Sequence, residues 1–246
     1  MGNTASALHS ASVSGDERRV LRDLQHGAHP NDQRIAPLHA AALFGRLNIM
    51  KLLLETSDVD IDRAIVLRPH LFPGFSDSKN PFPDSAITPL GCAILHGAVD
   101  GVKMIVEKGA SLESLHGGPA PLSLAICSHA AKEVIECLLD AGVYTGGGAD
   151  YVALAALHGN VVAMNVLYAR GVTTDTTRTL NAVLTKTNRA SIKDVCGTVT
   201  WLIDHGAKVQ CVPRIMEKLV DIQNVDAFEV VVIAYRDLLT TARRAE

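Results

Sequence analysis

Apolar and small residues recur along this chain in a two-part pattern. The first part is a short stretch in which an apolar residue precedes a glycine by seven positions, with small residues between them. This stretch occurs four times, at residues 7–15, 37–45, 89–97 and 152–159. After each glycine, apolar positions return at helical spacing, and a further glycine usually ends the unit. Because such spacing is typical of amphipathic helices closed by a left-handed glycine cap, the pattern predicts two short helices per unit.

The period of the repeat and its best copy point to a known family. Leu8 and Leu38 begin the core of successive copies and lie 30 positions apart. Residues 36–45, APLHAAALFG, match almost completely the pattern Thr-Pro-Leu-His-x-Ala-Ala-x-x-Gly of ankyrin repeats, whose period is near 33. Residues 88–90, Thr-Pro-Leu, open another copy. The chain therefore resembles an ankyrin-repeat protein with about six repeats.

The resemblance implies an all-α fold in which helix-turn-helix units stack into a solenoid. Residues 1–4 precede the first unit, and the ankyrin-repeat domain is expected to cover residues 5–210. Residues 211–246 keep helical periodicity without the landmarks of the repeat, so we expect a helical C-terminal cap there. The interval between the second and third copies exceeds one period by roughly 20 residues. This long insertion, residues 62–87, is expected to protrude from the solenoid.

The insertion has a composition that favours a contact surface. It holds four Pro and three Phe, whereas a solvated linker is normally poor in aromatic residues. Loops of this length tend to be functional or disordered. We favour a partner-contacting finger that uses Phe72, Phe75 and Phe82. The alternatives are that these rings pack onto neighbouring helices or that the loop is disordered.

The repeat register predicts a second binding surface. The two residues before the glycine between the helices are expected to point into the concave side of the solenoid. Stacked units would then form one row of leucines and a second row beside it, namely Leu43, Leu95 and Leu157, and Phe44, His96 and His158. Contiguous exposed apolar surface usually marks an interaction site. The alternative is that the leucine row packs under the turns and belongs to the core.

Charge and composition exclude several classes of function. Lys and Arg total 23 against 26 Asp and Glu, and no long basic field is present that would bind a phosphate backbone. We therefore expect no nucleic-acid partner. The five Cys are irregularly spaced and are expected to be reduced thiols of a cytoplasmic protein. The sequence contains no apolar run of the ~18 residues needed to span a bilayer.

Residue patterns of catalytic and cofactor sites are missing from the sequence. No Lys-Ser/Thr pair follows the run Gly146-Gly147-Gly148, and there is no Gly-x-Ser-x-Gly elbow. Cys127 and His129 have no second pair at zinc spacing. The histidines are mostly placed by the repeat and are expected to brace loops through hydrogen bonds. We predict a protein that is not an enzyme, with no catalytic residues, no metal site and no cofactor.

The N-terminus carries one short motif. Residues 1–6, MGNTAS, place Gly2 after the initiator Met and a Ser at the sixth position, which is the pattern of N-myristoylation. The alternative is that Ser6, which aligns with the capping Thr of a later unit, only starts a helix. One myristoyl chain binds membranes weakly, with a partition constant of about 10⁴ per molar. The first 35 residues carry no net charge that would strengthen this binding.

The repeat specifies a scaffold and not a ligand. What the ankyrin resemblance implies is protein–protein binding. The leading hypothesis is a monomeric, non-catalytic scaffold or adaptor in the cytoplasm that contacts membranes transiently through an acylated Gly2. Its protein partner is not specified by the sequence. The alternatives are a regulatory subunit or inhibitor whose 62–87 loop blocks a partner, and the ankyrin part of a larger protein.

Overall fold

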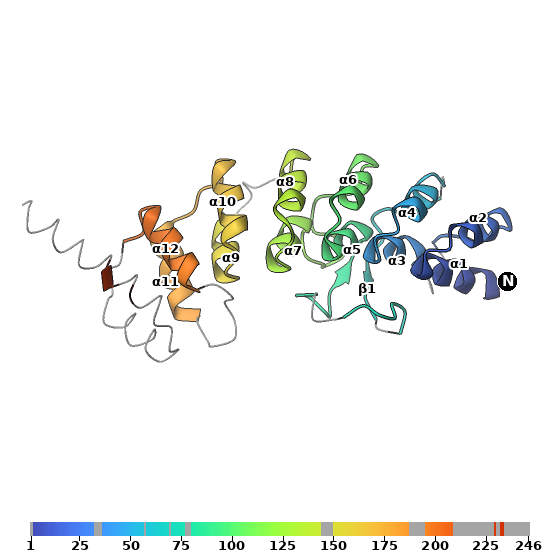
Figure 1. The fold of residues 1–246 in the computed structure, drawn as a ribbon, viewed down its shortest axis with the longest axis horizontal. Helices are drawn as coiled ribbons and strands as arrows, with labels where there is room; N and C mark the ends of the chain where they lie inside the picture. Colours follow the sequence, from blue (N-terminus) through green and yellow to red (C-terminus); the bar gives the residue numbers. More distant parts are fainter. Residues whose placement is uncertain are drawn as a thin grey trace, which may run out of the picture. The chain divides into compact units, whose positions relative to one another are not determined.

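In the part of the chain that the structure describes, the regular secondary structure consists almost entirely of short helices (Figure 1). The computed structural model describes residues 2–31, 36–56, 58–68, 70–76, 80–143, 150–186, 195–208, 229 and 232–233, with side chains from residue 7 onward. The chain divides into two compact units, Met1–Val143 and Tyr144–Glu246. We call them unit 1 and unit 2 and describe each by itself.

Unit 1 contains helices that come in antiparallel pairs. The pairs are α1 (Gly2–Ser14) with α2 (Glu17–Gln25), α3 (Pro37–Leu43) with α4 (Leu47–Leu54), α5 (Pro89–His96) with α6 (Val99–Glu107), and α7 (Pro121–Cys127) with α8 (Lys132–Asp140). The first helices of successive pairs pack on one another, and so do the second helices. Unit 1 is therefore a two-layered stack, as the repeat pattern predicts (Figure 1).

The residues of the repeat explain this local geometry. A proline opens α3, α5 and α7, where its missing N–H would have no helical partner. The Thr88 hydroxyl accepts a hydrogen bond from the Gly91 N–H at 3.2 Å and so caps α5. Ala40 and Ala41 are fully buried, and their small side chains allow the first helices to approach closely. Gly45, with a φ of +64°, makes the reversal between α3 and α4.

Unit 2 repeats the arrangement with two further pairs, α9 (Tyr151–Leu157) with α10 (Val161–Ala169), and α11 (Thr176–Lys186) with α12 (Val195–Asp204). The first helices, α9 and α11, pack together, and α10 packs on α12. Asp150 and Asn160 cap α9 and α10 by accepting backbone N–H bonds. Almost all of the predicted C-terminal cap, residues 211–246, lies outside the described residues, and so does the Gly146–Gly148 run.

Residues 62–87 lie between α4 and α5, and we call this segment the finger. Its two ends pair as strands β1 (Ile65–Val66) and β2 (Ala86–Ile87), which run antiparallel with Ile65 opposite Ile87. This two-residue ladder forms the foot of the finger and is a small addition to the all-α fold (Figure 1). Among the described helices, none has the length and apolar character needed to cross a bilayer.

Candidate interaction surface

The foot of the finger is fastened to the second repeat by His39. This residue lies in α3 and is 2% exposed, and its Nε2 lies 2.8 Å from the carbonyl oxygen of Arg63. Burial lowers the pKa of His39 to about 3, although backbone hydrogen bonds with Arg63 and Ile87 oppose that shift. The ring is therefore neutral, and Nε2–H donates to the Arg63 carbonyl. The prediction that this histidine braces a loop is confirmed.

The middle of the finger is fastened to the first repeat by His9. Its Nε2 lies 2.7 Å from the carbonyl oxygen of Leu71. The neighbouring residue Phe72 is 0% exposed and meets the His9 ring edge to face, with 5.5 Å between centroids. Leu67, just beyond β1, is also buried. The finger thus folds back onto α1 and contributes a large side chain to the core of unit 1.

This packing corrects one of our sequence predictions. Phe72 is fully buried, so it is not available as a partner-contacting residue. Burying its ring against His9 removes apolar surface from water, which favours packing over exposure. The alternative interpretation, that the rings pack onto neighbouring helices, therefore holds for Phe72. Phe75 and Phe82 are half-buried, and their role in partner binding stays a prediction.

The backbone of the finger is shaped by short-range hydrogen bonds. The Arg68 carbonyl accepts a bond from the Leu71 N–H at 2.9 Å, and the Asn80 side-chain oxygen accepts one from the Phe82 N–H at 2.9 Å. Polar and proline side chains remain exposed around these turns, namely Arg68, His70, Pro73, Ser76, Pro83 and Asp84. The finger therefore presents a mixed polar and ring-containing surface whose backbone is held at two anchors, His39 and His9.

The leucine row of the second predicted surface is also corrected. Leu43 and Leu95 are only 4% and 7% exposed, because α3 and α5 each pack between two neighbouring first helices. For these two residues, the alternative that the row is core is the right one. Leu157, in unit 2, is half-buried. A first helix inside a tight stack has almost no free face, and this explains the difference from the predicted stripe.

The second row is more accessible. Phe44 is half-buried at the C-terminal end of α3, and His96 is exposed at the end of α5. The His96 ring covers Gly45, where an added Cβ would overlap the ring nitrogen. These two side chains therefore lie at adjacent turns of unit 1. His158 occupies the same repeat position in unit 2 and is half-buried, and its place in a common stripe stays a prediction.

A groove of about 370 Å³ lies between the helix-connecting turns of the first two repeats. Its polar groups come mainly from three side chains. Asn48 donates to the Glu17 carboxylate at 2.6 Å, and the Arg46 guanidinium lies 3.4 Å from the Val13 carbonyl oxygen. The groove therefore offers both hydrogen-bond donors and hydrogen-bond acceptors.

Two of the three cysteines of unit 1, Cys92 and Cys127, are buried and poorly reactive. Burial raises the pKa of Cys92 far above its ordinary value and that of Cys127 to about 11. Both thiols therefore stay protonated at neutral pH, and a protonated thiol is a weak nucleophile. Over the part of the chain that the structure describes, no three potential metal-binding side chains come together.

The N-terminal motif lies at the start of a helix. α1 begins at Gly2, four residues before Ser6. The alternative that Ser6 serves only as an N-cap is therefore wrong, because Ser6 lies inside the helix. Whether Gly2 is acylated stays a prediction.

Sequence reasoning missed the contact of the finger with α1. His9 and Leu71 are 62 positions apart, so no periodicity of the repeat links them. The available signal was the combination of a histidine at the bracing position and aromatic residues in the insertion. That combination suggests ring packing but does not specify which ring is buried.

Comparisons with known proteins agree with the fold. The family model for ankyrin repeats (many copies) matches residues 8–54. No curated protein sequence matches the chain significantly. The crystal structure of the human ASB11 ankyrin repeat domain matches with a TM-score of 0.62 and 21% identity, over 82% of this chain and 85% of that chain. Ankyrin repeats suggest a role in protein–protein interaction, because their stacking creates extended binding surfaces. The family match over residues 8–54 and the shared fold show that this chain contains ankyrin repeats and has the ankyrin-repeat fold.

Proposed function

We propose that this chain is a non-catalytic scaffold that binds a protein partner through the exposed side of its finger. The observation that carries the proposal is that the finger is fixed at two separate places, at His39 and at His9. A binding loop that is already ordered loses less conformational entropy when it binds. The anchors therefore favour a contact role over that of a linker.

The exposed residues of the finger provide suitable chemistry for a protein contact. Arg68, His70 and Asp84 offer charged and hydrogen-bonding groups, and Pro73 and Pro83 offer rigid rings. The half-buried rings of Phe75 and Phe82 add apolar surface beside them. In protein interfaces a few aromatic and arginine residues often dominate the binding energy. The finger combines these residue types on one ordered segment.

The test begins with a photo-reactive amino acid at position 70 to capture the partner in cells, and at position 103 of α6 as the control site. The affinity of the captured partner is then measured for Arg68→Ala with His70→Ala, and for Lys103→Ala with Lys108→Ala. We expect the finger variant to lose roughly 30-fold in affinity, the scale of a hot spot, and the control to lose little. Both variants should keep the Tm of the wild type, because the four side chains are exposed. Equal affinities in well-folded variants would contradict the proposal.

Phe44, His96 and His158 remain candidates for a further contact with the same partner. Phe44→Ala, His96→Ala and His158→Ala are combined for this test, with half-buried Leu157 left unchanged. A loss of affinity in the triple variant that adds to the loss in the finger variant would extend the contact surface to the turns.

An inhibitory role of the finger is tested on the same captured partner, whose own activity would fall when the chain binds.

We propose in addition that Gly2 is N-myristoylated and gives this scaffold a transient contact with membranes. The support is the sequence motif and the position of Gly2 as the first residue of α1. The intact mass of the chain purified from eukaryotic cells should show removal of Met1 and addition of the acyl group. Gly2→Ala should move the membrane-associated fraction into the soluble fraction. A mass with a free or acetylated N-terminus would exclude this tether.

A further inference from the structure

We propose that one face of α2, formed by Arg18, Leu21 and Arg22, contacts the surface of an anionic membrane beside the acylated N-terminus. The inference rests on the proposed tether at Gly2 and supplies the second membrane signal that a single acyl chain needs. Counting charges in the sequence gives zero net charge for the first 35 residues. The fold separates those charges in space.

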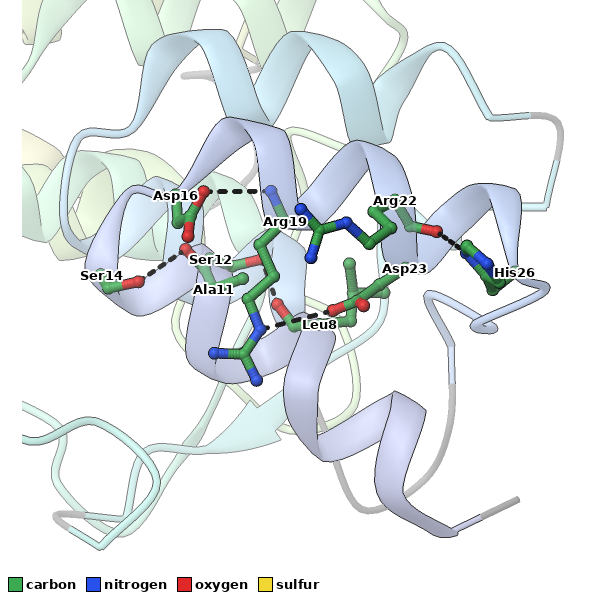
Figure 2. Close-up of polar contacts among 9 residues, drawn as sticks. All are labelled: Leu8, Ala11, Ser12, Ser14, Asp16, Arg19, Arg22, Asp23 and His26. Atoms are coloured by element: carbon green, nitrogen blue, oxygen red, sulfur yellow. Dashed lines mark hydrogen bonds and ion pairs between the residues drawn. The ribbon is translucent and has the colours of Figure 1, made fainter.

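The acidic side chains around α2 are engaged away from this face. Asp16 accepts the Arg19 N–H at 3.0 Å and caps the helix. Asp23 is only 15% exposed and lies 3.9 Å from the Arg19 guanidinium. The Glu17 carboxylate accepts a hydrogen bond from the side-chain amide of Asn48 in the next repeat. Figure 2 shows the Asp16 cap and the Arg19–Asp23 pair beside α1.

The basic and apolar side chains share the opposite side. Arg18, Leu21, Arg22 and Gln25 follow the spacing i, i+3, i+4 and i+7, so they lie on one helical face, and all four are exposed. Val20, on the other face, is fully buried. Among the described residues, no carboxylate lies within ion-pair distance of the Arg18 or Arg22 side chain. Figure 2 shows the contact of His26 Nδ1 with the backbone carbonyl oxygen of Arg22.

The apolar member of this face is unusual in unit 1. Leu21 is 42% exposed and is the one large hydrophobic side chain exposed among the described residues of that unit. The other second helices present mixed charges instead, such as Asp100 and Lys103 on α6. An exposed leucine flanked by two arginines matches an interface with lipid, where the apolar group enters the boundary and the guanidinium groups meet phosphates.

The position of this face fits the tether. α1 and α2 run antiparallel and are joined by the short turn at Gly15 and Asp16, so Gly2 and the C-terminal end of α2 lie at the same edge of unit 1 (Figure 1). An acyl chain that enters a membrane from Gly2 would therefore bring α2 close to the same surface. Each basic residue near an anionic membrane adds about 1 kcal/mol, so the two arginines should raise the partition constant about thirtyfold.

The experiment uses the full chain, myristoylated by co-expression with an N-myristoyltransferase, and measures sedimentation with vesicles. One set is pure phosphatidylcholine and the other contains about 30% phosphatidylserine, an anionic lipid. On the anionic vesicles, Arg18→Gln with Arg22→Gln should bind about thirtyfold more weakly than the wild type, and the two should bind equally to neutral vesicles. Lys103→Gln with Lys108→Gln removes the same charge from α6 and its C-cap, and should bind like the wild type.

A gain-of-binding variant keeps the test independent of folding. Gln25→Lys adds a charge to the same face and should bind anionic vesicles about fivefold more tightly. The proposal is overturned if Arg18→Gln with Arg22→Gln binds anionic vesicles like the wild type, or if Gln25→Lys brings no gain. Because the co-expressed transferase installs the acyl group, the vesicle experiment tests the face of α2 whether or not the protein is acylated in its own cells. The intact mass of the cellular protein decides that second question.

Discussion

His9 and His39 occupy the same position in successive repeats, yet they bind very different parts of the chain. Each uses Nε2 to contact a backbone carbonyl at a similar distance, 2.7 Å for His9 and 2.8 Å for His39. The partner of His39 is Arg63, 24 positions further along. The partner of His9 is Leu71, 62 positions further along and in the middle of the finger. One position of the repeat therefore serves both a local and a long-range contact.

The difference shows how an insertion can be built into a repeat fold. His39 is buried in α3 and holds the foot of the finger, which belongs to the second repeat. His9 is half-buried and meets the ring of Phe72, which the insertion adds to the core. The insertion thus uses a histidine of the preceding repeat as its second anchor. Because the two anchors are separate, they should respond differently to mutation and to pH.

The largest effect is expected at Phe72. Phe72→Ala removes a fully buried ring and should lower the free energy of unfolding by about 3 kcal/mol, at the lower end for such substitutions because a loop can relax. Chemical denaturation measures this loss. Phe75→Ala, at a half-buried position of the same segment, is the matched control and should cost about 1 kcal/mol. Equal, small losses would show that the finger adds nothing to the core.

The next largest effect is the contribution of His39 to the pH dependence of the free energy of unfolding. Because the folded-state pKa is about 3 and the ordinary value is 6.5, the unfolded chain binds more protons between these values. The stabilisation that neutral His39 contributes is fully present above pH 6.5, and it falls as the pH is lowered toward 3. Between pH 7.5 and pH 5 the free energy of unfolding should decrease by about 2 kcal/mol on account of His39 alone.

Two variants isolate this contribution. In His39→Gln the pH dependence between pH 7.5 and pH 5 should be flatter than in the wild type by about the same 2 kcal/mol. His29→Gln removes an exposed imidazole and should leave the wild-type slope unchanged. Parallel curves for wild type and His39→Gln would contradict the assignment of a neutral, buried ring.

The sequence was sufficient for the repeat architecture and for the loop-bracing role of His39, but it did not predict the β1–β2 ladder. The motif around His39 defines the helix pair, and a bracing histidine follows from the repeat register. The repeat register does not predict a bracing histidine in every copy. In the third repeat, Gly91 occupies the position that His9 and His39 occupy in the first two repeats. A Cβ at Gly91 would lie 2.7 Å from the Ile87 side chain, so β2 leaves no room for a larger residue.

The errors of the sequence analysis also have physical reasons. The burial of Leu43 and Leu95 depends on two neighbouring helices at once, whereas periodicity describes one helix at a time. The burial of Phe72 depends on a contact with α1 that no local pattern encodes. Charge counting over the first 35 residues missed the face of α2 because it ignores which carboxylates are engaged.

The smallest expected effect separates the two anchors. His9→Ala removes the hydrogen bond to Leu71 and the edge contact with Phe72, and should lower the free energy of unfolding by about 1 kcal/mol. A double-mutant cycle with Phe72→Leu should give a coupling energy of about 1 kcal/mol, since the two rings are in direct contact. His70→Ala, which replaces an exposed histidine on the same segment, should show no coupling with Phe72.

In hydrogen exchange, the amides of residues 71–75 should lose protection in His9→Ala, while those of β1 and β2 keep it, because His39 still holds the foot. Loss of protection in both places would mean that the finger opens as one unit and that its two anchors are not independent.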